Sequence, residues 1–280
     1  MKLAALGAFD GLHKGHMKVI DTAGSNCSVV LFEPVPRQMF GGLSWRNRLT
    51  TPAERYELLR DNGISSIITL PFDDVTAATT PQDFSRLLDE IGTFSGFVVG
   101  YDFRFGRDAS GNTVALRENL RKFGLTVTVV DSENIGGIPV KSGRIRQLLL
   151  EGDLSGAADF LGRAYGATGV VSRGRGFGRT LGFPTLNIRV PESKLLPLQG
   201  SYATFARIGC RKLEAVAFVV PDRNLVEVHV PSLEENFYGA EVSVEFISFI
   251  REPAFVNSEE MLKKLIENDL ARSMEVLREW

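Results

Sequence analysis

The chain has 280 residues, of which 44% are hydrophobic and 24% charged, and its formal net charge at pH 7 is −2. That length is long for one domain and gives each of two domains enough residues to bury a core of its own. The small net charge argues against a nucleic-acid or anionic-membrane partner, and no apolar stretch is long enough to cross a bilayer.

Residues 1–131 alternate between strand-like and helix-like segments. Short apolar and β-branched runs predict five strands: Leu3–Leu6, Ser28–Phe32, Ser66–Leu70, Gly96–Val99 and Thr126–Val130. Helical spacing of apolar residues predicts four helices between them: Met17–Thr22, Pro52–Asp61, Pro81–Ile91 and Thr113–Phe123. This alternation predicts an α/β domain with a doubly wound parallel sheet, whose ligands bind beyond the carboxyl ends of the strands.

The second half has a different pattern. Two more helices are expected, over Ser142–Leu150 and from the N-cap Asp153 through Leu161. Residues 166–250 then hold six short runs broken by Gly and Pro: Thr168–Val171, Thr185–Ile188, Tyr202–Ile208, Ala215–Val220, Val226–Val230 and Val242–Ile247. This spacing favours an antiparallel β-barrel, on which a last helix beginning near Ser258 should pack. We place the boundary near Gly162–Gly166, which gives domains 1–164 and 165–280.

Residues 7–16, Gly-Ala-Phe-Asp-Gly-Leu-His-Lys-Gly-His, join the first predicted strand to the first predicted helix. Free N–H groups and the helix dipole make such a junction an anion site, and glycines let the backbone approach a phosphate closely. His13 and His16 lie three residues apart, so both can project to one side and stabilise charge that develops on a phosphate. The alternative is a tight turn with two surface imidazoles.

A second glycine-bounded loop follows the fourth predicted strand, in the sequence Val-Val-Gly-Tyr-Asp-Phe-Arg-Phe-Gly at residues 98–106. Its aromatic rings, carboxylate and guanidinium could stack on a flat ring and bind an anion. The alternative is a well-packed loop with a structural pair between Asp102 and Arg104.

These motifs resemble those of the bacterial bifunctional riboflavin kinase/FMN adenylyltransferase (FAD synthetase) family. Residues 7–16 resemble its G-x-F-D-G-x-H-x-G-H signature, residues 32–36 its F-x-P-x-P stretch, and residues 98–106 its V-V-G-x-D-F-R-F-G pattern. Residues 140–146 align with a family S-S-T-x-I-R segment, in which Lys141 and Gly143 here replace two hydroxyl residues. The resemblance extends along nearly the whole chain.

For the first domain the resemblance implies adenylyl transfer from ATP to FMN. It places His13, His16 and Arg146 at the phosphates as catalytic groups. Further nucleotide-binding residues are expected at Gly7, Phe9, Asp10, Gly11, Gly15, Ser142 and Arg144. Flavin-binding residues are expected at Tyr101, Asp102, Phe103, Arg104 and Phe105.

For the second domain the resemblance implies riboflavin kinase. Residues 169–188 resemble the family's G-x-V-x-x-G-x-x-x-G-R-x-L-G-F-P-T-x-N pattern, in which Gly174, Gly178 and Arg179 would contact nucleotide. Thr185 and Asn187 are two residues apart on a predicted strand, so both face one way, and their oxygens suit Mg²⁺. The alternative is a glycine-rich hairpin with a buried threonine.

Glu227 stands where the family carries its catalytic carboxylate, a candidate base for the ribityl 5′-hydroxyl. The alternative is an outward-facing glutamate on an alternating strand, and His229 is expected at the strand surface with no chemical role. Residues 218–224 are shorter than the corresponding family loop and lack its N-x-G-x-x-P-T pattern, which could weaken or remove the kinase.

We therefore expect a cytoplasmic two-domain enzyme that uses ATP twice, with Mg²⁺, to convert riboflavin to FMN and FMN to FAD. Its partners would be these small molecules, without nucleic acid or membrane. Cys27 and Cys210 are expected as reduced, partly buried thiols in separate domains. The alternatives are an enzyme with one activity, a nucleotidyltransferase with another acceptor, or a regulatory protein that binds flavin or nucleotide.

Overall fold

The computed structural model describes residues 2–36, 47–92, 94–174, 177–231, 233, 235 and 237–280. It divides into two compact units, Met1–Ser142 and Gly143–Trp280. Helix α8 (Leu154–Leu161) and nearly all of α7 (Ser142–Leu150) belong to the second unit. The functional boundary expected near residues 164 and 165 stays a prediction.

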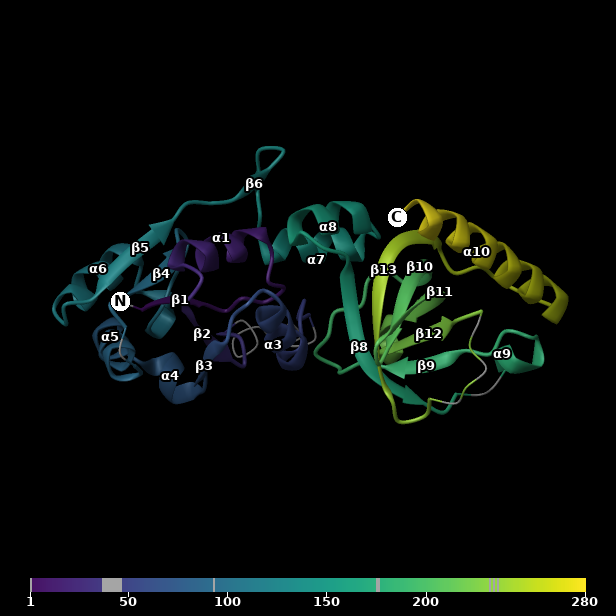
Figure 1. Ribbon diagram of the computed structural model, residues 1–280, viewed down its shortest axis with the longest axis horizontal. Coiled ribbons are helices and arrows are strands. Elements are labelled where there is room, and N and C mark those ends of the chain that lie inside the picture. Colours follow the sequence, from purple (N-terminus) through teal and green to yellow (C-terminus); the bar gives the residue numbers. More distant parts are fainter. Residues whose placement is uncertain are drawn as a thin grey trace. The chain divides into compact units, whose positions relative to one another are not determined.

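The first unit is built on a parallel sheet with the strand order β3-β2-β1-β4-β5 (Figure 1). Its strands are β1 (Leu3–Gly7), β2 (Ser28–Glu33), β3 (Ser66–Pro71), β4 (Gly96–Gly100) and β5 (Thr126–Val130). Its α-helices are α1 (Lys14–Ala23), α3 (Pro52–Asp61), α4 (Asp74–Ala78), α5 (Pro81–Glu90) and α6 (Thr113–Arg121). The five predicted strands and the doubly wound fold are confirmed. Helix α4 and the small hairpin of β6 (Asn134–Ile135) and β7 (Ile138–Pro139) were not predicted.

Apolar side chains alternate between the two faces of this sheet because successive strand residues point in opposite directions. Ala5 packs in the layer that contains Ile20 and Leu59, from α1 and α3. Ala4 packs on the other face, with Leu88 of α5 and Leu116 of α6. Two cores therefore hold β1 rigidly at the centre of the sheet, directly before the motif at residues 7–16.

Helix starts in this unit follow the sequence closely. Thr51 caps α3 in a reciprocal capping box with Glu54: the Glu54 N–H donates to Thr51 Oγ1 at 3.2 Å, and the Thr51 N–H donates to Glu54 Oε2 at 2.8 Å. At the start of α5 the Thr80 hydroxyl accepts the Asp83 N–H. In both helices a proline follows the N-cap residue.

The second unit begins with α7 and α8 and continues as a closed antiparallel barrel with the order β10-β11-β12-β9-β8-β13. Its strands are β8 (Tyr165–Ser172), β9 (Leu186–Arg189), β10 (Gly200–Ile208), β11 (Arg211–Val220), β12 (Leu225–His229) and β13 (Glu241–Arg251). All six predicted strands are present. The short helix α9 (Phe177–Thr180) was not predicted.

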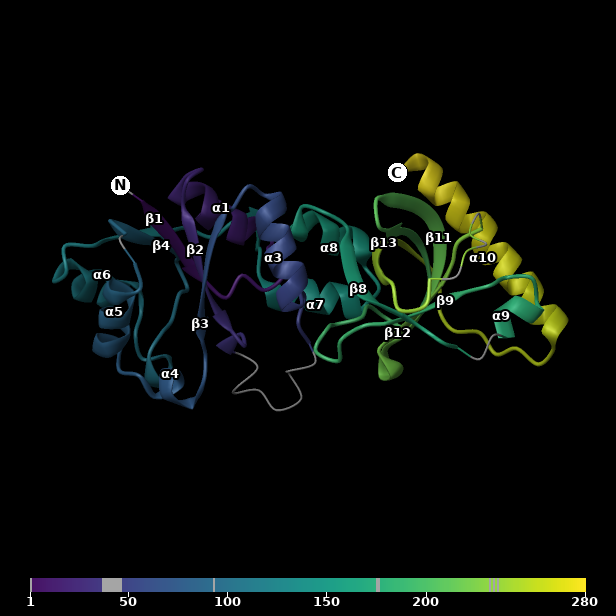
Figure 2. The same ribbon diagram turned by 60° about the horizontal axis from the view of Figure 1, so that its bottom comes forward.

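Helix α10 (Glu259–Glu279) lies along the barrel beside β10 and β11, as both ribbon views show (Figures 1 and 2). Ser258 caps it by accepting the Met261 N–H at 3.2 Å, as expected. Leu277 is buried against Ala203 and Ile250 of the barrel, so the last helix packs there as expected.

The two cysteines lie in different units, as expected. Cys27 is buried in the first unit, and burial raises the pKa of its thiol. Cys210 is exposed, so the expectation that both thiols are partly buried is wrong for it. In the part of the chain that the structure describes, none of the helices combines the length and apolar character needed to span a membrane.

Candidate active sites

The motif at residues 7–16 lies at the topological switch point of the sheet. Strand β1 pairs with β2 on one side and with β4 on the other, so the loops after β1 and β4 leave the sheet edge next to each other. A cavity of about 340 Å³ lies there, lined by both loops and by Lys141 and Ser142. The fold thus brings together residues that stand more than 90 positions apart in the sequence.

His13 is the N-cap of α1. Its Nδ1 accepts the N–H of His16 at 3.2 Å. An accepting nitrogen carries no proton, so the neutral His13 ring has its proton on Nε2. The cap therefore fixes one donor nitrogen of this imidazole, as a site for developing phosphate charge requires.

The two imidazoles stack with their centroids 3.5 Å apart and their planes inclined by 13°. Phe9 meets the His16 ring edge-on at a centroid distance of 5.3 Å. His13 is only 5% exposed, His16 is half-buried, and both line the cavity. The alternative of two surface imidazoles is therefore wrong.

The glycines of the motif make room for the protein's own side chains. Gly11 has φ +89°, and a Cβ there would lie 2.7 Å from Leu49 Cδ1. A Cβ on Gly15 would lie 3.3 Å from the His13 ring. Gly7 ends β1 and lines the cavity. That these glycines also admit a phosphate stays a prediction.

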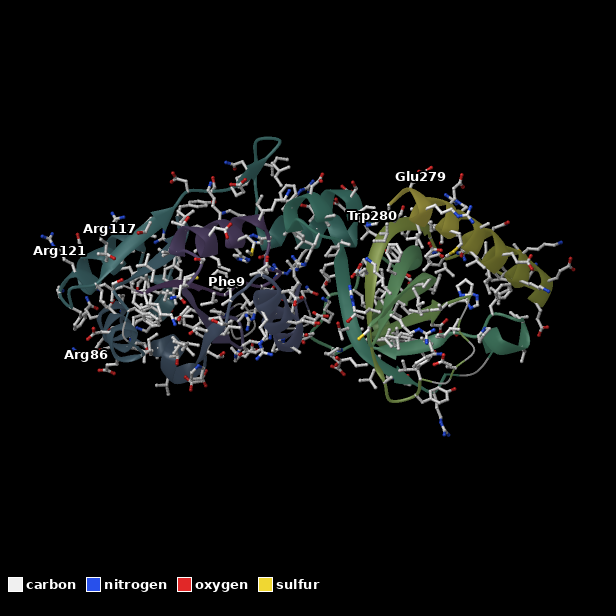
Figure 3. All side chains as sticks on the ribbon, in the orientation of Figure 1. Phe9, Arg86, Arg117, Arg121, Glu279 and Trp280 are labelled. Atoms are coloured by element: carbon white, nitrogen blue, oxygen red, sulfur yellow. The ribbon has the colours of Figure 1, made fainter. Side chains whose placement is uncertain are left out.

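Asp10 anchors the motif to the segment before α3. Its carboxylate is 4% exposed and accepts hydrogen bonds from the N–H groups of Leu49 and Thr50, at 3.3 and 3.0 Å, and from the Thr50 hydroxyl at 3.2 Å. Phe9 is 1% exposed and lies among the inward side chains of this unit (Figure 3). The contacts of Asp10 with residues 49 and 50 and of Phe9 with His16 hold the loop, and nucleotide contacts for both residues stay predictions.

A buried ionic cluster next to the motif was not predicted from the sequence. Arg55 is fully buried and donates to the carbonyl oxygens of Ala8 (2.6 Å) and Phe32 (3.3 Å) and to the Glu33 carboxylate (2.5 Å). Arg48 donates to both oxygens of Glu33, at 2.7 and 2.9 Å. Burial, and then the charge of Arg48, lower the pKa of Arg55. This cluster joins the carboxyl ends of β1 and β2.

The loop after β4 presents most of the expected flavin-binding residues to the cavity: Tyr101, Asp102, Phe103 and Arg104. Phe105 instead packs in the core, 5.1 Å from Phe84 between ring centroids, and does not line the cavity.

Asp102 makes an ion pair with Lys141 at 3.1 Å, in place of the pair with Arg104 that the sequence suggested as an alternative. The Lys141 ammonium also lies 5.3 Å from the Tyr101 ring centroid. Hydrogen bonds to Tyr101 and then to Asp102 raise the pKa of Lys141. The residue that departs from the family pattern therefore holds the loop after β4.

The segment at residues 142–146 falls on both units. The Ser142 hydroxyl donates to the carbonyl oxygen of Asp10 at 3.0 Å and lines the first cavity. Arg144 and Arg146 are half-buried in the first turns of α7, within the second unit. Their contacts with nucleotide phosphates stay predictions.

The second unit has a larger cavity, of about 1180 Å³. It lies between the barrel on one side and α10 with the residues just before it on the other. Polar residues of the barrel form one part of its wall, among them Thr185, Asn187 and Glu227. Leu262, Leu265 and Ile266 of α10 form an apolar part. A cavity with one apolar and one polar wall suits a flat aromatic ring that carries a polyhydroxy chain.

Glu227 of β12 lies directly opposite Asn187 of β9 in an antiparallel pair, so the two side chains share a face. Glu227 is half-buried, and burial raises the pKa of its carboxyl group while the charge of Arg223 opposes the rise. The alternative of an outward-facing glutamate is therefore wrong.

The glycine-rich segment packs against the two expected metal ligands. A Cβ on Gly174 would lie 2.3 Å from Asn187 Nδ2, and a Cβ on Gly178 would lie 2.5 Å from the Phe183 carbonyl oxygen. Thr185 Oγ1 is 3.5 Å from that second position. The Arg179 side chain lies outside the described residues.

Several residues that line this cavity were given no role from the sequence, among them His229 and Arg251. His229 is 7% exposed and lines the cavity, so its expected place at the strand surface is wrong. The signal was available, because residues two apart on a strand share a face and Glu227 was already a candidate site residue. Arg251, at the end of β13, donates two hydrogen bonds to the carboxylate of the buried Asp269 of α10, at 2.8 and 2.7 Å. This bidentate pair joins the strand to the helix.

Each half of the chain matches a known family. The FAD synthetase family description matches residues 1–144, and the riboflavin kinase description matches residues 161–277. The bifunctional riboflavin kinase/FMN adenylyltransferase of Escherichia coli strain K12 is 30% identical over 95% of this chain and 90% of its own. The Haemophilus influenzae protein of the same name is 31% identical, over 95% of this chain and 91% of its own.

The fold is also found among solved structures. A crystal structure described as a macrolide-efflux protein from Streptococcus pneumoniae matches with a TM-score of 0.86 and 27% identity. The match covers 100% of this chain and 94% of that chain.

Proposed function

Since the chain belongs to the bifunctional riboflavin kinase/FMN adenylyltransferase family, we propose that it phosphorylates riboflavin to FMN and adenylylates FMN to FAD. The observation that carries the proposal is that each unit places its own family signature around its own cavity. One ATP is used in each step, with ADP released by the kinase and pyrophosphate by the adenylyltransferase.

In the first unit, an FMN phosphate oxygen attacks the α-phosphorus of ATP, and the bond to the pyrophosphate oxygen breaks. The nucleophile is already ionised at neutral pH, so the protein's task is alignment and charge stabilisation. We assign His13 and His16 as donors to the developing charge, because both imidazoles line the cavity at the N-terminus of α1. The Lys141 ammonium supplies a further cation beside the flavin loop.

In the barrel, the ribityl 5′-hydroxyl attacks the γ-phosphorus of ATP, and the bond to the ADP oxygen breaks. A neutral hydroxyl must lose its proton during this attack. We assign Glu227 as the base that takes it, because its carboxylate is half-buried in the cavity and burial raises its pKa toward neutrality.

Thr185 and Asn187 would hold Mg²⁺ together with the ATP phosphates. The fit is chemical: a hydroxyl and an amide oxygen are hard donors, and both side chains line the cavity that contains Glu227. When bound, the ion would neutralise charge on the triphosphate.

The departures from the family pattern favour retention of both activities over a regulatory protein or a single activity. The shortened loop folds as a turn at Pro221–Arg223, and Arg223 lines the cavity. Lys141 replaces a neutral hydroxyl residue with a cation that lines the other cavity. We further propose small-molecule partners alone and a cytoplasmic location.

A single assay tests the proposal. The purified protein is incubated with riboflavin, ATP and Mg²⁺, the flavins are separated chromatographically, and ADP and pyrophosphate are measured. Both FMN and FAD should form, with ADP equal to the sum of the two flavin products and pyrophosphate equal to FAD alone. FAD formed only from supplied FMN would show a single activity, and flavin binding without either product would show a regulatory protein.

A further inference from the structure

His229 is the last residue of β12 and lines the cavity between the barrel and α10. It lies two residues after Glu227 on the same strand, so both side chains are on the same face. The imidazole is buried and lines the cavity.

The ring is held at two points by the segment that precedes β9. Its Nδ1 lies 2.8 Å from the carbonyl oxygen of Pro184. A carbonyl oxygen can only accept, so Nδ1 carries the proton and donates it. The Phe183 ring meets the imidazole edge-on, with centroids 5.4 Å apart and planes inclined by 80°.

This contact begins where the backbone pairing ends. Strands β12 and β9 are paired from Leu225 with Arg189 to Val228 with Leu186. Thr185 and Pro184 lie beyond the last of these pairs, so the strand ladder does not fix them. The His229 side chain takes over at this point and ties the segment to β12.

The glycine-rich segment is joined to the same point. The Phe183 N–H donates to the Gly178 carbonyl oxygen at 2.8 Å, and the Leu181 N–H donates to the same oxygen at 3.2 Å. A displacement of residues 183–185 would therefore move both Thr185 and the end of α9.

We propose that His229 is a positioning residue for phosphoryl transfer. Its Nδ1–H fixes the Pro184 carbonyl, and through it holds Thr185 and the glycine-rich segment in register with Glu227. This inference rests on the proposed kinase activity. It predicts that the donor nitrogen of His229 matters more than the volume of its ring.

Three substitutions test this. Asparagine places an amide N–H close to the position of Nδ1, whereas glutamine places it one bond farther out. Phenylalanine keeps a ring against Phe183 and removes the donor. His229→Asn, His229→Gln and His229→Phe are compared with the parent for FMN formation at varied Mg²⁺–ATP and at varied riboflavin. FAD formation from supplied FMN and thermal unfolding are measured on the same preparations.

We expect His229→Phe and His229→Gln to lower kcat/KM for Mg²⁺–ATP by about tenfold to a hundredfold, because misplacement of a reacting group carries losses of this size. The KM for riboflavin should change less, and His229→Asn should recover most of the loss. FAD formation from FMN should be unchanged in all three variants.

Other outcomes overturn the inference. Parent-like kinetics of His229→Phe would show that the donor has no role in positioning. Equal losses in His229→Asn and His229→Gln, or a fall in thermal stability with unchanged kcat/KM for Mg²⁺–ATP, would show a packing role only. A parent protein that makes no FMN would overturn the kinase function and this inference with it.

Discussion

The two cavities serve reactions with different nucleophiles, and the residues around them differ accordingly. Around the first cavity, buried groups anchor the loop that carries His13 and His16. Arg55 donates to the Ala8 carbonyl oxygen, and the Asp10 carboxylate accepts the Thr50 N–H. Around the second, a half-buried carboxylate with a raised pKa stands in a larger space. An FMN phosphate is already an anion when it attacks, whereas a ribityl hydroxyl needs a base. The nature of the nucleophile thus explains why the barrel reaction needs a base and the reaction at the first cavity does not.

The largest expected effect comes from removing that base. Glu227→Gln keeps the shape of the side chain but cannot accept the hydroxyl proton at neutral pH. FMN formation should fall by about 10²–10⁴-fold, and FAD formation from FMN should be unchanged.

The matched control for this change is Glu214→Gln, an identical substitution at an exposed position of β11. It should leave both rates at the parent values. If Glu227→Gln forms FMN as fast as the control, Glu227 has no role as a base.

The reciprocal change affects the first site. His16→Ala removes one of the two stacked imidazoles, and FAD formation should fall by about 10²–10³-fold, as for loss of a donor to developing charge. Riboflavin phosphorylation by the same preparation serves as the control for folding. A variant that keeps the parent rate of FAD formation would remove His16 from the mechanism.

The rigidity of the first site depends on Arg55. Arg55→Met leaves the carbonyl oxygens of Ala8 and Phe32 without this donor, while Glu33 keeps Arg48. We expect a loss of about 3 kcal/mol in the free energy of unfolding. Arg86→Met removes an exposed pair with Asp83 and should change it by at most about 1 kcal/mol. Denaturant unfolding of the two variants measures the difference, and equal values would show that the buried cluster adds no stability.

The fold could be read from the sequence because its signals are local. Strand runs such as Ser28–Phe32 and caps such as Asp153 depend on neighbouring residues, and both were predicted correctly. The supports of the sites depend on distant residues. Arg55 binds the carbonyl oxygen of Ala8, 47 positions away, and no local pattern reports such a contact. Lys141 and Asp102 were each identified, but their pairing follows only from the meeting of two loops at the sheet edge.

The pH dependence of the two rates should also differ, by a smaller factor than the substitutions of Glu227 and His16 give. The kinase needs Glu227 ionised, and burial raises the pKa of that carboxyl group above its usual value. Its rate should therefore fall as the pH drops through this raised pKa, with an inflection above that of an ordinary glutamate. The FAD-forming rate should not share this inflection, because its nucleophile is a phosphate. Coincident profiles for kcat/KM of the two reactions would contradict the assignment.

The smallest expected effect concerns Lys141, where this chain departs from its relatives. The Lys141 ammonium lines the first cavity and is half-exposed in its pair with Asp102. Lys141→Ser restores a hydroxyl and removes a cation, so the KM for FMN should rise by about threefold to tenfold at low ionic strength and by less at high salt. Lys212→Ser is the matched control, since Lys212 of β11 pairs with Glu245 at 2.8 Å, its side chain is exposed to a similar extent, and neither residue lines either cavity. If both variants have the parent KM at low salt, the cation at residue 141 holds the Asp102 loop and does not contact FMN.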